Sequence, residues 1–339
     1  MGGLSNLRGK LILGLIFGLL VVAGMSVVAD FTKMLEVLRR FEWWLLPFIL
    51  LFTVFNYVLR FFKWDVYLRL IGASGVAKKD SLMIFLSGMA MAMTPGKVGE
   101  VLKSYLVKQV RGTPIATSAP IVMAERLTDG LAMLVLALAG LVLFDYGRPV
   151  MAAIALVVLV FLVVFQNRAL ANRLLGMGER IPFLTTRIHH FHAFYDSSYE
   201  LFRLPNLLFG GGVGVVSWSG EVAAFVLVMI GLGIPFSLSL VILCAFILSA
   251  STLIGSVTLL PGGLGTTDAS ITGMLLFLVP VALAGQTIDK NTAIAATLLI
   301  RFATLWFGVG IGLVALTLTQ RRLGTFTPPA DEQMVGVET

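Results

Sequence analysis

Six uninterrupted apolar segments, between 17 and 30 residues long, constrain the fold of this chain more than any other feature of its sequence. They are Lys10–Ala29, Trp43–Phe62, Ile115–Phe144, Val150–Gln166, Asn206–Leu232 and Thr292–Thr319. An α-helix needs about 20 apolar residues to cross a bilayer core of about 30 Å. The sequence therefore predicts an all-α polytopic membrane protein with six full spans.

The composition argues against other classes of protein. Hydrophobic residues make up 58% of the 339 residues and charged residues only 13%, whereas soluble domains contain about 45–50% and about 25%. A soluble enzyme and a disordered regulator are both disfavoured, and a single cysteine, Cys244, cannot form an internal disulfide. The net charge of +7 is divided among short segments between apolar runs, unlike the single basic face of a nucleic-acid-binding protein. We therefore expect no nucleic-acid partner.

The positions of lysine and arginine predict the orientation. The segments before Leu11 and at 60–79, 97–111, 168–203 and 321–322 carry 18 of the 25 basic residues, and the alternate segments carry only 5. The positive-inside rule then places both termini in the cytoplasm. The first apolar run is longer than the roughly 7–15 residues of a signal-peptide core, so we expect it to stay as a span.

Two further apolar stretches, Ser81–Val110 and Phe236–Ala284, are interrupted by the same pattern, Pro-Gly-x-apolar-Gly. Proline cannot continue a helix and glycine tolerates positive φ, so each pattern predicts a helix break with a turn. The residues of the two breaks are Pro95, Gly96, Lys97 and Gly99, and Pro261, Gly262, Gly263 and Gly265.

The surroundings of the two breaks also match. Each broken stretch follows one span and precedes another that contains an arginine, Arg126 or Arg301. Charge counting gives the two units opposite orientations, so we predict two re-entrant broken-helix hairpins related as an inverted repeat around a midplane binding site. The repeat halves would cover about 43–144 and 206–319 of a single domain, 1–322, followed by a disordered cytoplasmic tail, 323–339. The alternative is a pair of ordinary Pro-Gly loops in a ten-span protein.

Ionisable residues inside the apolar runs mark the candidate site. A charge at the bilayer centre costs about 3 kcal/mol or more, so it must face a cavity or a partner. Glu125, Arg126 and Asp129 lie within five positions of one span. They form either part of a site for a polar headgroup or an internally neutralised structural cluster.

Arg301 has no opposite charge in its own segment, and its candidate partners are Asp268 and Glu221. Glu221 is equally open to a role in helix packing alone. Near the first break lie Lys97, Glu100 and Lys103, and we expect the two lysines to gather with Arg126 around one phosphate. The alternative is lysines at the membrane surface attracted to anionic lipid.

Three other features carry no chemistry in this interpretation. Arg60 and Lys63, which end the second span, are expected to snorkel to the interface. Gly14 and Gly18 form a GxxxG pattern, which predicts close helix packing inside the chain or in a homodimer. The histidines at 189, 190 and 192 lack the further ligands of a closed metal site, so neither a metal nor a cofactor is expected.

Three motifs resemble one membrane-protein family. PGKVGE at Pro95–Glu100, AERLTDG at Ala124–Gly130 and PGGLGTTD at Pro261–Asp268 are similar, in this order, to motifs of the lysylphosphatidylglycerol synthase transmembrane, or flippase-like, family. The resemblance covers about residues 10–320. It implies a lipid-translocating domain with re-entrant helices around a central cavity, here as a stand-alone member without the soluble synthase domain.

We therefore expect a lipid flippase of the bacterial inner membrane, with phosphate-containing lipids as its partners and no enzymatic activity. Lys97, Arg126 and Arg301 would hold the phosphate, and Glu125, Asp129 and Asp268 would balance charge, hold an amino headgroup or take up protons. The alternatives are a secondary transporter of a small anionic solute and a non-transporting partner of a lipid-modifying enzyme.

Overall fold

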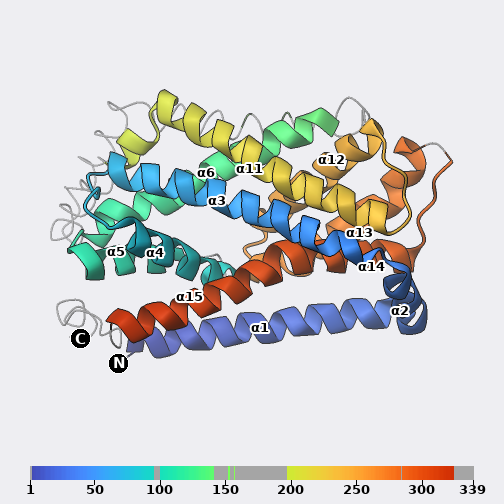
Figure 1. Cartoon of the computed structure of the whole chain (residues 1–339), viewed down its shortest axis with the longest axis horizontal. Helices are drawn as coiled ribbons and strands as arrows, with labels where there is room; N and C mark the ends of the chain where they lie inside the picture. Colours follow the sequence, from blue (N-terminus) through green and yellow to red (C-terminus); the bar gives the residue numbers. More distant parts are fainter. Residues whose placement is uncertain are drawn as a thin grey trace.

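The computed structural model describes residues 2–94, 100–140, 197–283 and 285–323, together with residues 152 and 156, and the regular structure of these residues is entirely helical (Figure 1). The α-helices are α1 (Gly2–Val28), α2 (Phe31–Arg40), α3 (Leu46–Leu70), α4 (Lys78–Ala90), α5 (Leu102–Arg111), α6 (Ile115–Gly140), α11 (Leu204–Gly231), α12 (Leu238–Val257), α13 (Thr266–Ala282), α14 (Lys290–Arg301) and α15 (Phe307–Leu323). Short 3₁₀ turns are η1 (Trp43–Leu45), η2 (Met91–Met93) and η5 (Pro261–Gly263), and η6 (Phe302–Trp306) is a π-helical turn between α14 and α15.

Five helices among the described residues are long and apolar enough to cross a membrane. They are Trp43–Leu70, Leu204–Gly231, Leu238–Val257, Pro261–Ala282 and Lys290–Arg322. Two of them contain the predicted spans Trp43–Phe62 and Thr292–Thr319, a third covers all of Asn206–Leu232 but its last residue, and the other two lie within the second broken stretch. Helix α1 contains a shorter apolar part, Ile12–Met25. The predicted span Val150–Gln166 and the tail after residue 323 lie outside the described residues, apart from residues 152 and 156.

Helix α3 is apolar on its outside and polar on its inside. A row of exposed side chains recurs every three or four residues along it: Phe48, Leu51, Phe55, Val58 and Phe62. Its buried side chains include Thr53, Asn56 and Lys63, each with 0% exposure. Water would favour the reverse arrangement, whereas hydrocarbon solvates the apolar face and requires polar groups to face the interior. The helix is therefore built for a lipid environment.

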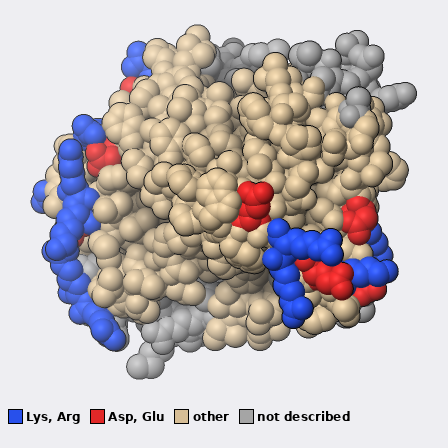
Figure 2. All heavy atoms as spheres, turned by 45° about the vertical axis from the view of Figure 1, so that its right-hand side comes forward, with Lys and Arg blue, Asp and Glu red and all other residues tan. Residues whose placement is uncertain are grey.

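Charged side chains gather at the two ends of the molecule. In Figure 2, lysine and arginine dominate one end, acidic and basic residues mix at the other, and most of the surface between them carries no charge. Figure 1 shows that α1 begins and α15 ends at the same end, beside α4 and α5, whereas α2 lies at the opposite end. This distribution is the one expected of a protein that crosses a bilayer along its long axis.

The second predicted break is confirmed by the backbone. After α12 ends at Val257, Gly262, Gly263 and Gly265 adopt φ values of 58°, 65° and 81°, and Leu259 has φ 56°. Residues with a Cβ rarely adopt positive φ values, which explains why the pattern is rich in glycine. At the first break α4 passes into η2 and the chain is extended at Thr94, but Pro95, Gly96, Lys97 and Gly99 lie outside the described residues.

The two broken segments meet inside the protein. The turns η2 and η5 contact each other, and helix α1 contacts both. Gly14 of α1 lies against Met93, and Gly18 lies against Trp306 and Leu264, with no room for a Cβ at either glycine. The GxxxG pattern therefore serves close packing within the chain.

Two apolar clusters form the ends of the interior, and polar residues lie between them. Along α3, Ile49 belongs to one cluster and Trp64 to the other, with Thr53, Asn56 and Lys63 buried in or beside the interval. Along α6 and α11 the polar residues Glu125, Asp129 and Glu221 fall in the same interval. The fold thus collects buried charge about halfway along its long helices.

Candidate functional site

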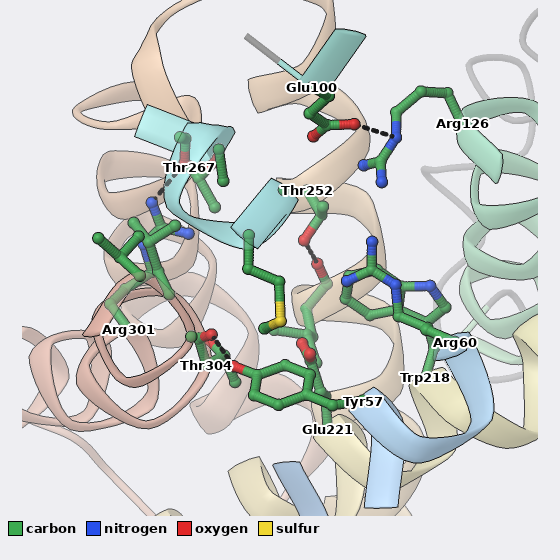
Figure 3. A pocket seen from close by; sticks show the side chains of 18 of the residues that line it. Tyr57, Arg60, Glu100, Arg126, Trp218, Glu221, Thr252, Thr267, Arg301 and Thr304 are labelled. Atoms are coloured by element: carbon green, nitrogen blue, oxygen red, sulfur yellow. Dashed lines mark hydrogen bonds and ion pairs between the residues drawn. The ribbon is translucent and has the colours of Figure 1, made fainter. Parts of the chain in front are cut away.

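A cavity of about 150 Å³ lies in this polar interval, between α3, α6, α11, α12 and the η5 and η6 turns (Figure 3). The polar side chains that line it are Tyr57, Arg60, Glu100, Lys103, Arg126, Trp218, Glu221, Thr252, Thr267, Arg301 and Thr304. They come from both halves of the chain. Arg301 and Arg60 lie on opposite sides of the cavity in Figure 3, with Glu100 and Arg126 together above Arg60. The cavity therefore brings both predicted intramembrane arginines to one place.

Asp129 is the centre of the charge cluster in the first half. Its Oδ1 accepts a hydrogen bond of 2.6 Å from Nζ of Lys63, and its Oδ2 lies 3.5 Å from Arg60 and 3.6 Å from Arg126. Lys63 also donates to Oγ1 of Thr128 over 3.1 Å. Since Asp129 is 3% exposed and Lys63 is 0% exposed, each charge needs the other, because an unpaired charge in the membrane interior is costly.

The inward positions of Arg60 and Lys63 contradict the prediction that both side chains snorkel to the interface. The apolar run ends at Phe62, but α3 continues to Leu70, so Lys63 lies inside the helix and faces α6. The spacing of Asn56, Arg60 and Lys63, four and three residues apart, places them on one face with Thr53. This stripe of polar residues on one helix face is the sequence signal that predicts an inward position for Arg60 and Lys63. Tyr57, Trp218, Thr252 and Thr304 carry no comparable signal in the sequence.

Glu125, Lys103, Glu100 and Arg126 form two further pairs. Nζ of Lys103 contacts Glu125 and lies 4.5 Å from the centre of the Trp64 ring. Nε of Arg126 lies 3.3 Å from Oε2 of Glu100. The Lys103 ammonium is thus directed to a carboxylate, while the Arg126 side chain keeps 30% exposure and faces the cavity.

Arg301 is held by the second break. Its Nε lies 2.8 Å from Oδ1 of Asp268, and its Nη2 donates to the carbonyl oxygen of Gly262 over 2.6 Å. Of the two candidate partners, the structure therefore selects Asp268. The other oxygen of Asp268 accepts from the backbone N–H of Gly265 over 2.8 Å, which caps the start of α13. Pro261 and Gly263 are buried in the turn itself.

The π-helical turn η6 directly follows Arg301. It widens the helix at Phe302–Trp306, and the hydroxyl of Tyr57 donates to the carbonyl oxygen of Thr304 over 2.7 Å. Such turns are frequent at functional sites because they release backbone groups from the helical ladder. Here the hydrogen bond from Tyr57 to Thr304 joins α3 to the η6 turn at the wall of the cavity.

Glu221 differs from the other buried carboxylates. It is 5% exposed, lines the cavity, and has no hydrogen bond or ion pair to any residue that the structure describes. The charges that act on it at longer range belong to Arg60, Asp129 and Arg301. Its carboxylate is thus available to a group inside the cavity.

Two buried donors also lack partners. Nε of Arg60 and Nε1 of Trp218 are buried and have no hydrogen-bond acceptor in the described part of the chain, although the Arg60 guanidinium lies over the Trp218 ring at 5.8 Å. Buried donors in proteins nearly always have an acceptor. Because both residues line the cavity, an acceptor-rich ligand or water is expected there.

No group of three or more potential metal ligands gathers among the described residues. The histidines at 189, 190 and 192 lie outside them. The site is therefore made of arginine, lysine, carboxylate and aromatic groups, a set suited to binding an anion or a zwitterion.

Comparison with known proteins agrees with these features. The lysylphosphatidylglycerol synthase TM region matches residues 13–312. A "UPF0104 membrane protein" from Methanothermobacter thermautotrophicus is 25% identical over 331 residues, which cover 89% of this chain and 93% of that protein. No solved structure shows a significant match. With nearly the whole chain matched, the protein belongs to the lysylphosphatidylglycerol synthase TM region family.

Proposed function

We propose that this protein is a lipid flippase that moves a phosphate-containing lipid between leaflets through the central cavity. The observation that carries the proposal is the gathering of guanidinium groups from Arg60, Arg126 and Arg301 around a cavity with unpartnered buried donors. A guanidinium offers five N–H donors, and the ion pairs of these arginines leave part of each fork directed at the cavity. Phosphate oxygens are the acceptors that such forks bind best.

The proposal includes an inverted repeat of two re-entrant hairpins. Helices α4 and α5 have 13 and 10 residues, and at 1.5 Å per residue they span only about 20 Å and 15 Å. In each half a carboxylate near the restart of the helix pairs with the arginine of the following span, Glu100 with Arg126 and Asp268 with Arg301. The contact between η2 and η5 agrees with two segments that enter from opposite sides. Helices α12 and α13 are longer, and α13 would pass deeper than α5.

In this mechanism the headgroup enters the cavity while the hydrocarbon chains stay outside it, and no covalent bond changes. The protein is accordingly not an enzyme in this proposal. We place it in the bacterial plasma membrane with both termini in the cytoplasm, because α1 begins and α15 ends at the same lysine- and arginine-rich end (Figures 1 and 2).

The test is reconstitution in liposomes that contain a headgroup-labelled phospholipid, with a membrane-impermeant quencher added outside. The wild type should move label between leaflets, and Arg126→Ala and Arg301→Ala should not. A matched control is Arg322→Ala, whose side chain is 56% exposed and paired with Asp80 at the end of the molecule. If the two cavity variants moved lipid like the wild type, the cavity assignment would be wrong. Uptake of free phosphate without lipid movement would instead indicate a solute transporter.

A further inference from the structure

We infer that a groove between α6 and α12 binds one hydrocarbon chain of the lipid whose headgroup occupies the central cavity. This inference rests on the proposed function and specifies where the chain lies. The groove has a volume of about 410 Å³. Its lining includes Arg126, Trp218 and Thr252 on the polar side, and Val122, Met133 and Leu253 on the apolar side.

The groove adjoins the cavity. Glu100, Arg126, Trp218 and Thr252 line both of them. In a phospholipid the phosphate is joined to the chains through a short glycerol backbone. A phosphate held by Arg126 at the junction would therefore place its chains at the mouth of this groove and not deeper in the polar cavity.

The groove has the character of a chain-binding site. Its inner wall includes Met133 and Val122, which are 5% and 9% exposed, and Leu253 and Leu260 are among its other apolar residues. Both acids of the wall have cationic partners: Asp129 is engaged by Lys63, Arg60 and Arg126, and Glu100 pairs with Arg126. A chain that lies in this groove keeps its methylene groups out of water, where each would cost about 0.8 kcal/mol, whereas a soluble anion gains nothing from an apolar groove.

The outer end of the groove opens to the side of the molecule. Leu259 is 66% exposed and Val101 is 38% exposed. Leu259 also has φ 56°, a conformation that costs a bulky residue about 1–2 kcal/mol. A lipid chain that enters between the helices would contact the Leu259 side chain at the rim, and this contact would explain why an apolar side chain is exposed there.

Gly130 provides a direct test. It lines the groove, and a Cβ at this position would meet nothing within 4 Å. Gly130→Leu should therefore fill the groove without disturbing the packing of α6. The matched control is Gly211→Leu on α11, where a Cβ also meets nothing within 4 Å and which lines neither cavity. Both changes replace a helical glycine with a better helix former, so both variants should fold, which melting temperature in detergent verifies.

Two measurements distinguish the inference from the proposed function. In the liposome assay Gly130→Leu should slow lipid movement by about tenfold, as expected when about two methylene groups of the chain lose their place in the groove and are exposed to water. Gly211→Leu should match the wild type. Binding of glycerol phosphate, which has no chains, should be the same in Gly130→Leu and wild type but weaker in Arg301→Ala. If wild type moves lipid and Gly130→Leu moves it equally fast, the groove assignment is wrong while the flippase function stands. If wild type moves no lipid, the proposed function itself fails.

A third measurement uses the unaltered protein. A phospholipid with a photoreactive group in its chain, incorporated with the wild type, should label peptides of α6 that contain Met133. That residue is only 5% exposed and lines the groove. Labelling confined to the outer face of α3, at Phe48 and Leu51, would overturn the inference.

Discussion

The guanidinium of Arg301, the last residue of α14, lies 2.8 Å from the carboxylate of Asp268, which belongs to the preceding helix α13. The same guanidinium donates to the carbonyl oxygen of Gly262 in the second break. Arg126 and Glu100 make the corresponding pair in the first half at 3.3 Å. Each broken stretch is thus joined by an ion pair to the helix that follows it, and each arginine still lines the shared cavity.

The pair of Arg301 and Asp268 should show strong energetic coupling. Asp268 is 3% exposed, so Arg301→Gln would leave a buried carboxylate without its cation and lower stability by about 3 kcal/mol. Asp268→Asn should cost a similar amount. The double variant should cost less than the sum of the two by about 1–3 kcal/mol. Thermal unfolding of the four proteins in detergent measures the coupling, and additive effects would show that the contact carries no energy.

Replacement of Lys63 should lower the stability of the protein far more than replacement of an exposed lysine. Lys63→Met removes the nearest cation from Asp129 while keeping a side chain of similar length, and we expect a loss of about 3 kcal/mol. The control is Lys33→Met, because Lys33 pairs with Asp30 over 3.5 Å while its side chain is 67% exposed. The stability of this variant should equal that of the wild type. Melting temperatures in detergent compare them. Equal tolerance of both changes would mean that the Lys63 ammonium is not held as described.

The sequence alone was sufficient for the features that depend on residue type along one segment. The glycines of Pro261–Gly265 predict a turn because only glycine adopts positive φ freely, and three of them do so. Arg126 and Arg301 stand out because any charge within an apolar run must find a partner. The choice between Asp268 and Glu221 as partner of Arg301 needed the structure, since both residues lie on other helices.

Features that depend on how helices face one another were not accessible in the same way. Lys63 was predicted at an interface because hydropathy measures how apolar a segment is and not which side of it faces a neighbour. Its direction is determined by Asp129, which is 66 residues away in sequence. The π-helical turn at Phe302–Trp306 lies in a segment without proline or glycine, so no local signal marks it.

Asp289, in the loop before α14, should stabilise the protein in a pH-dependent way. Burial alone would raise the pKa of this carboxyl, but hydrogen bonds from Thr292 and Asn291 outweigh it and lower the pKa below its usual value. A group with a depressed pKa in the folded state stabilises above the pKa of the unfolded chain, and this contribution is lost as pH falls through the folded value. Asp289→Ala should therefore lower stability by about 1 kcal/mol or less at pH 7, and the difference from wild type should shrink near pH 3.

Asp289→Asn is the matched control for this effect. Asparagine caps helices about as well as aspartate but has no charge to lose, so this variant should equal wild type at pH 7 and should not share its loss of stability in acid. Melting temperatures of the three proteins across this pH range give the comparison. A constant difference between wild type and Asp289→Ala at every pH would refute the role of the charge.

Under the proposed function, Glu221 should influence which lipid headgroup the cavity accepts. Its carboxylate faces the cavity without an ion pair to any described residue, so in its ionised form it repels a second negative charge on a ligand whose phosphate is held by the arginines. Glu221→Gln should raise the transport of an anionic phospholipid relative to a zwitterionic one by about tenfold, the effect of one charge at close range in a partly screened site. The control is Glu36→Gln on α2, where the side chain is exposed and the ratio should not change. The two rates are compared in the same liposomes with distinguishable labels, and an unaltered ratio in Glu221→Gln would exclude this carboxylate from headgroup selection.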